Sequence, residues 1–378
     1  MKIAIVCYPT YGGSGVVATE LGKYLATRGH EIHFISYAMP HRLSEFVDNI
    51  FYHEVESYNY PLFEFPLYSI ELASKIAEVV KYNDVELIHA HYAIPHATSA
   101  YLAREILKKE RGKCNVKVVT TLHGTDITLI GLEPTFLPTM KFSIEQSDGV
   151  TAVSNFLKEK TITAYKVEKE IEVIPNFIDI EKYNRDTIKI CNLKNHFAPN
   201  DEKILVHTSN FRPLKRVQDV IKIFFEVRKK INVKLLLIGD GPERSECEHL
   251  SRELGIYEDV KFMGKQDSIA ELLCLSDLFI MPSQSESFGL SALEAMSCSV
   301  PAITSSVGGL PELNIHGETG YIAEIGDIER MAKYAVELLT NEKKYKLFSK
   351  RARERAMEFS MENIIPLYEK HYEKILSS

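Results

Sequence analysis

Short apolar runs alternate along the whole chain with longer stretches in which apolar residues recur at helical spacing. Runs such as Lys2–Tyr8 and Leu278–Met281 have the length and composition of buried strands, whereas Val16–Thr27 and Val217–Lys230 show the period of amphipathic helices. Strands that alternate with helices form a parallel sheet covered on both faces. The pattern therefore predicts an α/β fold built on doubly wound parallel sheets.

The pattern pauses between Val173 and Asn200, where a domain boundary is expected. We expect a first domain at 1–176, a second at 177–358, and a C-terminal helix at 359–378 that returns to the first domain. Two such domains would face a cleft lined by loops that follow the carboxyl ends of strands. The other expected elements are strands at Glu31–Ser36, Leu87–Ala90, Val116–Leu122, Gly149–Val153, Lys203–Thr208, Lys234–Ile238, Val260–Met263 and Pro301–Thr304, and helices at Leu67–Tyr82, Ser245–Leu254 and twice within Lys343–Ser378.

Composition narrows the class of protein. A chain of 378 residues is too long for one ordinary core, and a net charge of −7 argues against nucleic acid as a partner. Six cysteines without a C-x-x-C pair argue against a disulfide framework or a zinc ribbon and fit a reducing cytoplasm. No apolar run approaches the roughly 18 residues of a membrane-spanning helix, so no membrane partner is expected.

A glycine-rich segment follows the first expected strand and opens a helix. It reads Tyr8-Pro9-Thr10-Tyr11-Gly12-Gly13-Ser14-Gly15, and glycines at a helix start let an anion approach the backbone. Residues 13–18 also fit the dinucleotide fingerprint G-x-G-x-x-A, but the acid expected at the end of the second strand is missing, because Ser36 and Tyr37 stand there. The segment indicates a loop for a phosphate or a polar substrate, with a purely structural turn as the alternative.

Histidines end the next two strands. His89 and His91 form an H-x-H pair, but no carboxylate or thiol cluster completes a metal site, so a histidine in the core or at its rim is favoured. His123 ends a strand and is followed by Gly124, where the backbone turns beside the expected cleft. We expect His123 to contact a ligand.

The second half carries charged residues at strand ends. Arg212 and Lys215 follow its first strand and suit a diphosphate, although a solvated basic turn has the same composition. Gly239-Asp240-Gly241 is expected mainly to form a turn, with contact to a ligand as a secondary role. Glu286 and Glu294 form an E-x7-E pair, with one acid before a helix start and the other about two turns into the helix. The pair can grip the hydroxyls of a phosphorylated sugar, or it can lie on a solvated helix face.

In this order, the motifs resemble those of the retaining glycosyltransferases of family 4, which have two Rossmann-like domains (the GT-B fold), over nearly the whole chain. Residues 7–22 and 89–96, with Phe211-Arg212-Pro213, are similar to members of that family that act in bacillithiol synthesis. The resemblance implies UDP-N-acetylglucosamine (UDP-GlcNAc) as the donor and the hydroxyl of L-malate as the acceptor, with retained anomeric configuration. It implies no cofactor, and it suggests a homodimer.

The resemblance also implies roles for particular residues. His123, Lys215, Arg212 and Glu286 are the expected catalytic residues. The residues expected to bind the donor are Gly13, Asn210, Phe288, Gly289, Leu290 and Glu294. Many relatives have Arg at the position of Asn210, and Arg212 is the candidate to supply that charge. No D-x-D occurs, so the diphosphate is expected to be bound without metal.

Malate carries two carboxylates, which need cations or convergent N–H and O–H donors. The residues expected to bind the acceptor are Ser14, Tyr92, Thr121 and Asn155, with Arg244 and Lys141 as candidates for the cation.

Three other functions remain open. A family 4 enzyme can use another acceptor, such as inositol phosphate or a lipid, although the aromatic stretch 58–65 is acidic, which disfavours a membrane-binding face. An epimerase of the same fold would consume the donor without an acceptor. A sensor would bind the nucleotide sugar without acceptor-dependent release of UDP.

Overall fold

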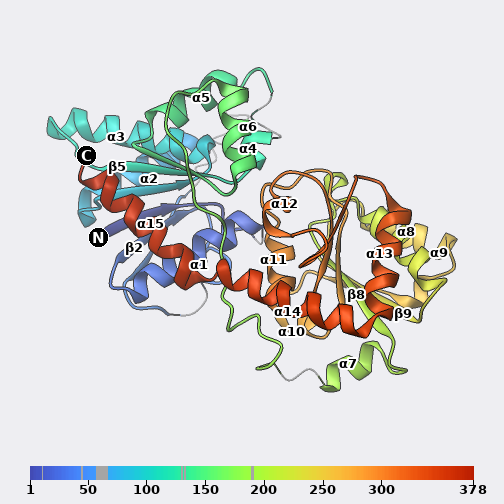
Figure 1. Cartoon of the computed structure of the whole chain (residues 1–378). Helices are drawn as coiled ribbons and strands as arrows, with labels where there is room; N and C mark the ends of the chain where they lie inside the picture. Colours follow the sequence, from blue (N-terminus) through green and yellow to red (C-terminus); the bar gives the residue numbers. More distant parts are fainter. Residues whose placement is uncertain (11, 44–45, 57–66, 129–130, 132, 189–190) are drawn as a thin grey trace. The chain divides into compact units, whose positions relative to one another are not determined.

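The computed structural model describes residues 1–10, 12–43, 46–56, 67–128, 131, 133–188 and 191–378 (Figure 1). The chain forms two compact units: unit 1 contains residues 1–176 and 362–378, and unit 2 contains residues 177–361. The aromatic stretch 58–65 lies outside the described residues. Among the described residues, no helix combines the length and the apolar character that crossing a membrane requires.

Unit 1 is built on a seven-stranded parallel sheet in the order β3-β2-β1-β4-β5-β6-β7. The strands are β1 (Lys2–Val6), β2 (Glu31–Ser36), β3 (Ile50–Glu54), β4 (Leu87–His91), β5 (Lys117–Leu122), β6 (Gly149–Ala152) and β7 (Glu172–Val173). Every residue of β4 and of β6 is buried, as expected for a parallel sheet covered on both faces. The chain reverses its direction of winding between β1 and β4, which makes their carboxyl ends the switch point of this sheet.

Helices pack against the sheet of unit 1. They are α1 (Gly13–Thr27), α2 (Tyr68–Asn83), α3 (Thr98–Arg111), α4 (Thr125–Thr128), α5 (Leu137–Gln146), α6 (Asn155–Tyr165) and α15 (Met361–Leu376), with an irregular turn η1 at Ala93–Ala97. One core cluster joins α2 and α3 to β1 and β4 through side chains such as Leu72, Ile76, Val6 and Ile88.

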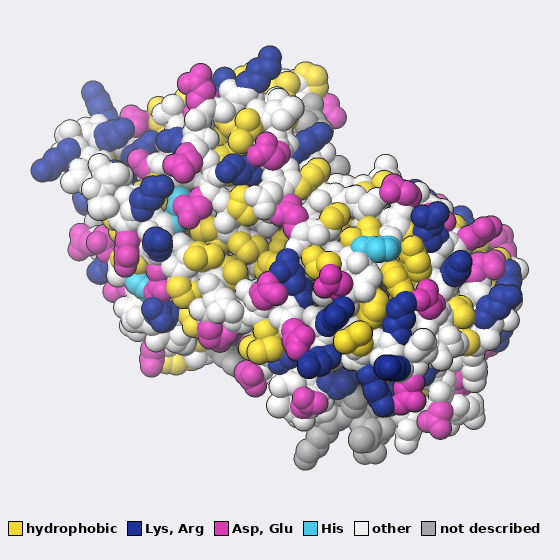
Figure 2. Space-filling model, viewed as in Figure 1, with side chains coloured by type: hydrophobic (Ala, Val, Ile, Leu, Met, Phe, Trp, Pro, Cys, Tyr) yellow, Lys and Arg dark blue, Asp and Glu magenta, His cyan; other side chains and the backbone are white. Residues whose placement is uncertain are grey.

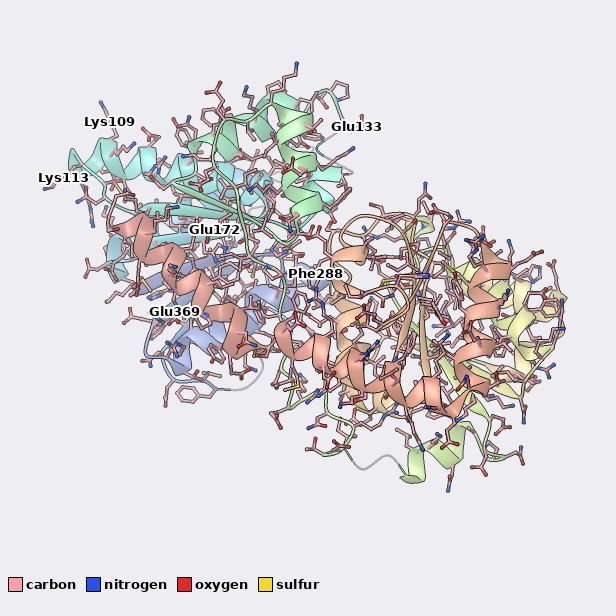
Figure 3. All side chains as sticks on the ribbon, in the orientation of Figure 1. Lys109, Lys113, Glu133, Glu172, Phe288 and Glu369 are labelled. Atoms are coloured by element: carbon pink, nitrogen blue, oxygen red, sulfur yellow. The ribbon has the colours of Figure 1, made fainter. Side chains whose placement is uncertain are left out.

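The last helix, α15, belongs to unit 1 for nearly its whole length. The hydroxyl of its buried Tyr372 lies 2.8 Å from Nδ1 of His89 in β4. Nearer the surface, the carboxylate of Glu369 accepts a hydrogen bond from Arg28 at the end of α1 (Figure 3). These contacts anchor the C-terminal helix to the first sheet.

Unit 2 has a six-stranded parallel sheet in the order β10-β9-β8-β11-β12-β13. Its strands are β8 (Lys203–Thr208), β9 (Val233–Ile238), β10 (Val260–Gly264), β11 (Leu278–Met281), β12 (Ala302–Ser305) and β13 (Gly320–Ala323). Its helices are α7 (Cys191–Phe197), α8 (Val217–Arg228), α9 (Arg244–Glu253), α10 (Ala270–Cys274), α11 (Leu290–Ser297), α12 (Leu310–Leu313), α13 (Ile328–Thr340) and α14 (Glu342–Glu358), with short turns η3 (Pro213–Lys215) and η4 (Tyr257–Asp259). The switch point lies between β8 and β11.

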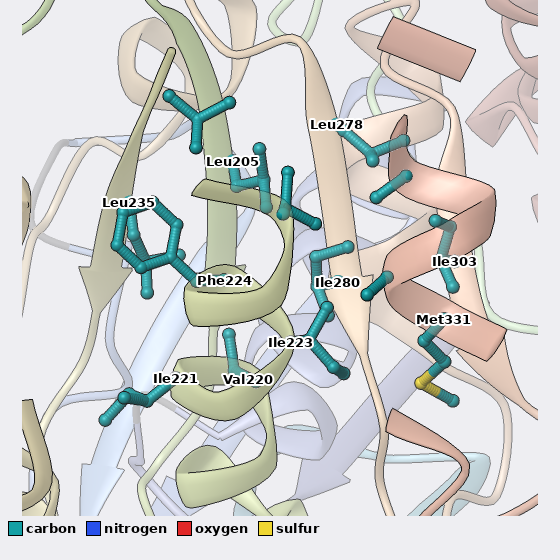
Figure 4. Close-up of a cluster of buried hydrophobic side chains, with 14 of the residues drawn as sticks. Leu205, Val220, Ile221, Ile223, Phe224, Leu235, Leu278, Ile280, Ile303 and Met331 are labelled. Atoms are coloured by element: carbon teal, nitrogen blue, oxygen red, sulfur yellow. The ribbon is translucent and has the colours of Figure 1, made fainter. Parts of the chain in front are cut away.

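The core of unit 2 fills the space between its sheet and helices α8 and α13 (Figure 4). Phe224 and Val220 of α8 lie over Leu205 and Leu235 of the sheet, and Met331 of α13 joins the same cluster. Basic and acidic side chains are interspersed on the face of each unit that Figure 2 shows.

The sheets confirm the predicted α/β class, and all ten expected strands are present within two residues of their predicted ends. The pattern missed β3, β7 and β13. The strand β3 lies at the sheet edge with no fully buried residue, and β7 has two residues, so neither shows a buried apolar run. Helix α1 begins at Gly13 rather than Val16, because the glycines already have helical geometry.

Candidate functional site

In unit 1, a side-chain contact joins the two loops at the switch point. The hydroxyl of Tyr92, which follows β4, donates to Oγ of Ser14 at the start of α1, with 2.6 Å between the oxygens. A Cβ on Gly15 would lie 2.5 Å from the carbonyl oxygen of Thr10, so only glycine fits where the loop folds against itself. Two predicted acceptor residues, Ser14 and Tyr92, are thus in contact, and Gly13 is the first residue of α1 beside them.

His123 follows β5 and pairs with a second histidine. Its Nε2 lies 2.8 Å from Nδ1 of His91, and the two rings stack with centroids 5.0 Å apart. Burial lowers the pKa of His123 to about 3 and holds the pKa of His91 well below its ordinary value, so both rings are neutral near pH 7. His91 is fully buried, whereas His123 keeps partial exposure. His123 therefore presents a neutral imidazole edge at the strand end.

A buried carboxylate fixes the loops on either side of this pair. Asp126 in α4 accepts hydrogen bonds from the backbone N–H groups of Ala93 and Gly124, each at 3.1 Å. Burial raises the pKa of Asp126 to about 6, although the hydrogen bonds from backbone amides oppose this shift. Asp126 ties the loop after β4 to the loop after β5. No role for Asp126 is predicted from the sequence, although an acid three residues after His123, at the start of a helix, is a signal for one.

Thr121 and His89 lie in the interior. His89 is fully buried, and its Nε2 lies 2.7 Å from Oγ1 of Thr121, which also contacts Oγ1 of Thr151 at 2.7 Å. The expectation of a core histidine at His89 is confirmed. Asn155, the remaining acceptor candidate, is exposed at the first residue of α6. Among the described residues, no group of three or more His, Cys, Asp or Glu side chains could hold a metal ion.

In unit 2, an ion pair joins the two loops at the switch point. Nζ of Lys215, after β8, lies 2.5 Å from Oε1 of Glu286, after β11, and Oγ of Ser283 donates to the same oxygen at 3.0 Å. The two charged side chains are only 19% and 11% exposed. The sequence motifs place Lys215 and Glu286 at different parts of a donor, and their spacing does not predict that they contact each other.

The neighbouring basic residue has a different environment. Arg212 is exposed, and within the described part of the chain its guanidinium has no hydrogen-bond or ion-pair partner. Asn210 is also exposed, and its carbonyl oxygen would lie 2.0 Å from a Cβ on Gly241. A Cβ on Gly239 would similarly lie 1.8 Å from the carbonyl oxygen of Ser209. The two glycines therefore let the turn after β9 pack directly on the loop that carries Asn210 and Arg212.

The second acid of the E-x7-E pair lies closer to the helix start than expected. Helix α11 begins at Leu290, so Glu294 is about one turn into it rather than two, because Gly289 has a φ of 98° and does not continue the helix backward. Oε1 of Glu294 accepts a hydrogen bond from the Tyr183 hydroxyl at 2.8 Å. Phe288, before the helix, is buried against Phe359 (Figure 3).

A second glycine pair supports Glu286 and was missed in the sequence. The backbone N–H of Gly309 donates to the carbonyl oxygen of Glu286 at 3.1 Å, and a Cβ on Gly308 would lie 1.7 Å from that oxygen. The available signal was the run Gly308-Gly309-Leu310-Pro311, in which two glycines precede a helix that has Pro in its first turn.

The two cations proposed for the acceptor carboxylates form pairs within their own helices. Arg244 lies 3.0 Å from Glu248, and Lys141 lies 3.7 Å from Glu145. Arg244 also lies 3.8 Å from Asp240, in the turn after β9. The cation expected for the acceptor therefore has no structural assignment.

Comparison with known proteins covers both units. A model of "Glycosyltransferase Family 4" matches residues 11–182, and a model of "Glycosyl transferases group 1" matches residues 191–355. A relative from Bacillus anthracis, N-acetyl-alpha-D-glucosaminyl L-malate synthase, is 48% identical over 378 residues, which cover 100% of this chain and 97% of the relative.

Solved structures agree on the fold. A glycosyltransferase from Rickettsia africae superposes with a TM-score of 0.81 at 22% identity, covering 99% of this chain and 98% of the other. Anabaena HepE in complex with UDP-glucose gives 0.79 at 22% identity, covering 100% of both chains. These likenesses show the GT-B fold. The match to the Bacillus anthracis relative over the full length, together with the two family models, establishes that the chain belongs to glycosyltransferase family 4.

Proposed function

We propose that the protein transfers N-acetylglucosamine from UDP-GlcNAc to the hydroxyl of L-malate with retention of the anomeric configuration, the first step of bacillithiol synthesis. The observation that carries the proposal is the 48% identity to the Bacillus anthracis malate synthase over the whole chain. Two features of the units support it. Each sheet brings polar side chains together at its switch point, which is where ligands bind in doubly wound folds.

Unit 2 supplies the groups that suit a nucleotide diphosphate. Lys215 and Arg212 carry positive charge after β8, and the start of α11 offers backbone N–H groups at Gly289 and Leu290 that no side chain caps. Departure of UDP builds negative charge on the diphosphate. Fixed donors aimed at developing charge are typically the largest catalytic contribution, with one donor contributing about 3–4 kcal/mol.

The carboxylates of unit 2 are proposed to bind hydroxyl groups. Glu286, held by Lys215 and Ser283, would accept hydrogen bonds from the transferred sugar. Glu294, oriented by Tyr183, would accept those of the ribose. Because carboxylates accept hydrogen bonds only, both would select hydroxyl-bearing groups over phosphates.

Unit 1 supplies neutral donors for the acceptor and the reacting sugar. The Ser14 hydroxyl, whose oxygen accepts from Tyr92, has its own proton to donate at the switch point, and the amide of Gly13 begins α1 beside it. Such donors can bind a dicarboxylate without transferring a proton to it. We propose that His123 contacts the transferred sugar, and that the acceptor hydroxyl attacks on the leaving-group face and passes its proton to a phosphate oxygen. The new bond joins the acceptor oxygen to the anomeric carbon, and the bond from that carbon to the diphosphate breaks.

The test is acceptor-dependent release of UDP. Purified protein is incubated with UDP-GlcNAc alone, with L-malate, and with inositol phosphate, and the anomeric configuration of any product is read by NMR. Release with L-malate and an α-linked product are expected, with full activity in the presence of a chelator. Consumption of UDP-GlcNAc without an acceptor would identify an epimerase. Binding of UDP-GlcNAc without release of UDP would identify a sensor, and UDP release with inositol phosphate but not with L-malate would identify a different acceptor class. Each of these results overturns the proposal.

A further inference from the structure

The buried partner of His123 bears on the reaction. His91 has no exposed surface, and its ring lies between those of His89 and His123, with centroids at 4.3 Å and 5.0 Å. One of its nitrogens, Nδ1, lies 2.8 Å from Nε2 of His123. The other, Nε2, is buried and has no hydrogen-bond partner among the described residues.

Two neutral rings that share one hydrogen bond have two arrangements. In the first, Nδ1–H of His91 donates to Nε2 of His123, which leaves the His123 proton on Nδ1 and a bare Nε2 on His91. In the second, Nε2–H of His123 donates to His91, and the His91 proton then sits on a buried Nε2 without an acceptor. Orphaned buried N–H groups are rarer in proteins than under-satisfied acceptors, so the first arrangement is favoured.

We propose that His91 is a positioning residue that donates its Nδ1–H to Nε2 of His123 and so holds His123 in the tautomer protonated at Nδ1. Among the described residues, the Nδ1–H of His123 has no acceptor and is then available to donate to a ligand, and the ring has no bare nitrogen left to accept the proton of the acceptor hydroxyl. The role in transfer rests on the proposed function. Within that function, His123 donates to an oxygen of the transferred sugar and is not the general base.

The tautomer can be read without any substrate. The full chain labelled with 15N-histidine is examined by 15N NMR, with His123→Gln used to assign the His123 signals. We expect Nδ1 of His123 to carry the proton and Nε2 to have the shift of a bare, hydrogen-bonded nitrogen. A proton on Nε2 of His123 in the unmodified protein would overturn the inference, and the one variant used, His123→Gln, serves only to assign the signals.

Variants of His91 separate hydrogen bonding from packing. His91→Leu removes the donor, whereas the amide nitrogen of His91→Asn can take the place of Nδ1. His91→Leu should lower kcat about 10- to 100-fold, the scale seen when the outer partner of a metal-bound histidine is removed, with KM for UDP-GlcNAc little changed. His91→Asn should recover most of the rate and the wild-type tautomer. Equal losses in both variants would assign His91 to packing and overturn the inference.

His33 provides a matched control in the same sheet. It is buried in β2, and its Nδ1 lies 2.9 Å from Nε2 of His53, away from the strand-end loops. Unlike His91, it has a partner for its other nitrogen, because its Nε2 lies 3.0 Å from Oε1 of Glu31. His33→Leu should leave kcat and the His123 spectrum unchanged, and a loss equal to that of His91→Leu would count against a specific role for His91. If the unmodified protein makes no glycosyl malate, the proposed function fails, whereas the spectrum still tests the tautomer.

Discussion

Replacing Lys215 by methionine should damage both catalysis and stability, for separable reasons. Methionine keeps most of the side-chain volume and removes the charge. In the structure, Nζ of Lys215 lies 2.5 Å from Glu286, whose carboxylate is only 11% exposed. The substitution therefore removes a donor proposed for the diphosphate, and it leaves a largely buried carboxylate with Ser283 as its remaining hydrogen-bond donor among the contacts described here.

The two effects have different sizes. Loss of one fixed donor to developing charge lowers turnover by about 10²- to 10³-fold, equivalent to about 2.7–4 kcal/mol. Removing one partner of a buried ion pair destabilises by about 3–5 kcal/mol, and the lower end applies because both side chains keep some exposure. For a unit of about 150–250 residues, 3 kcal/mol corresponds to a fall in Tm of about 6–12 °C.

A second substitution separates these contributions. In Lys215→Met with Glu286→Gln, no uncompensated charge remains, so we expect most of the lost Tm to return while turnover stays low. Arg212→Met is the matched control, because Arg212 is exposed and has no partner within the described part of the chain. It should lower turnover with little change in Tm.

The assay is UDP release at saturating UDP-GlcNAc and L-malate, together with thermal unfolding of each variant. Near-normal turnover in Lys215→Met would remove Lys215 from the mechanism. A double variant that regains turnover along with Tm would show that the ion pair acts only on stability.

Three further outcomes follow from the structure. Glu294→Ala should raise KM for UDP-GlcNAc with a smaller change in kcat, and an unchanged KM would contradict its assignment to the ribose. Gly308→Ala should lower both Tm and turnover, because its Cβ would lie 1.7 Å from the carbonyl oxygen of Glu286. Gly317 also has a positive φ but lies in open space, so Gly317→Ala should lose only stability. Burial lowers the pKa of His89 to about 3, so the unfolded chain binds the proton first and stability falls as the pH drops from about 6.5 towards 3. In denaturant unfolding at pH 7 and pH 5, a His89→Gln variant should lose up to about 1.4 kcal/mol per pH unit of this dependence, and an unchanged slope would refute the assignment.

The α/β class could be predicted from the sequence because strands buried on both faces of a parallel sheet consist of consecutive apolar residues. Leu278–Met281 is apolar at every position, and the structure buries all four residues in β11. The edge strand Ile50–Glu54 leaves no such record, because its residues are partly exposed and mix aromatic with charged side chains. The apolar pattern therefore detects central strands. It misses edge strands, which form because they pair with a neighbouring strand and whose own sequence is not apolar.

Contacts between loops could not be predicted, since they depend on register and backbone direction that no spacing encodes. Lys215 and Glu286 are 71 residues apart in the chain, and they meet because β8 and β11 are neighbours in the sheet. Asp126 was overlooked for a related reason. Its partners are backbone N–H groups at Ala93 and Gly124, and a backbone donor has no side-chain signature in the sequence.

The two switch points have the same topology, but the contact that joins the loops is between charged side chains in one and uncharged side chains in the other. In unit 2 the bridging contact is the ion pair of Lys215 with Glu286, and in unit 1 it is the hydroxyl pair of Tyr92 with Ser14. The sequence segments 8–15, 91–97 and 122–126 contain no Lys or Arg, and burial lowers the pKa of His91 and His123, which keeps both rings neutral near pH 7. A diphosphate that gains charge during reaction requires fixed cations, whereas a dicarboxylate whose charge stays constant can be held by neutral donors. The difference between the two sheets suits this reaction, because the leaving diphosphate gains negative charge as the sugar becomes oxocarbenium-like, whereas the carboxylates of the acceptor keep theirs.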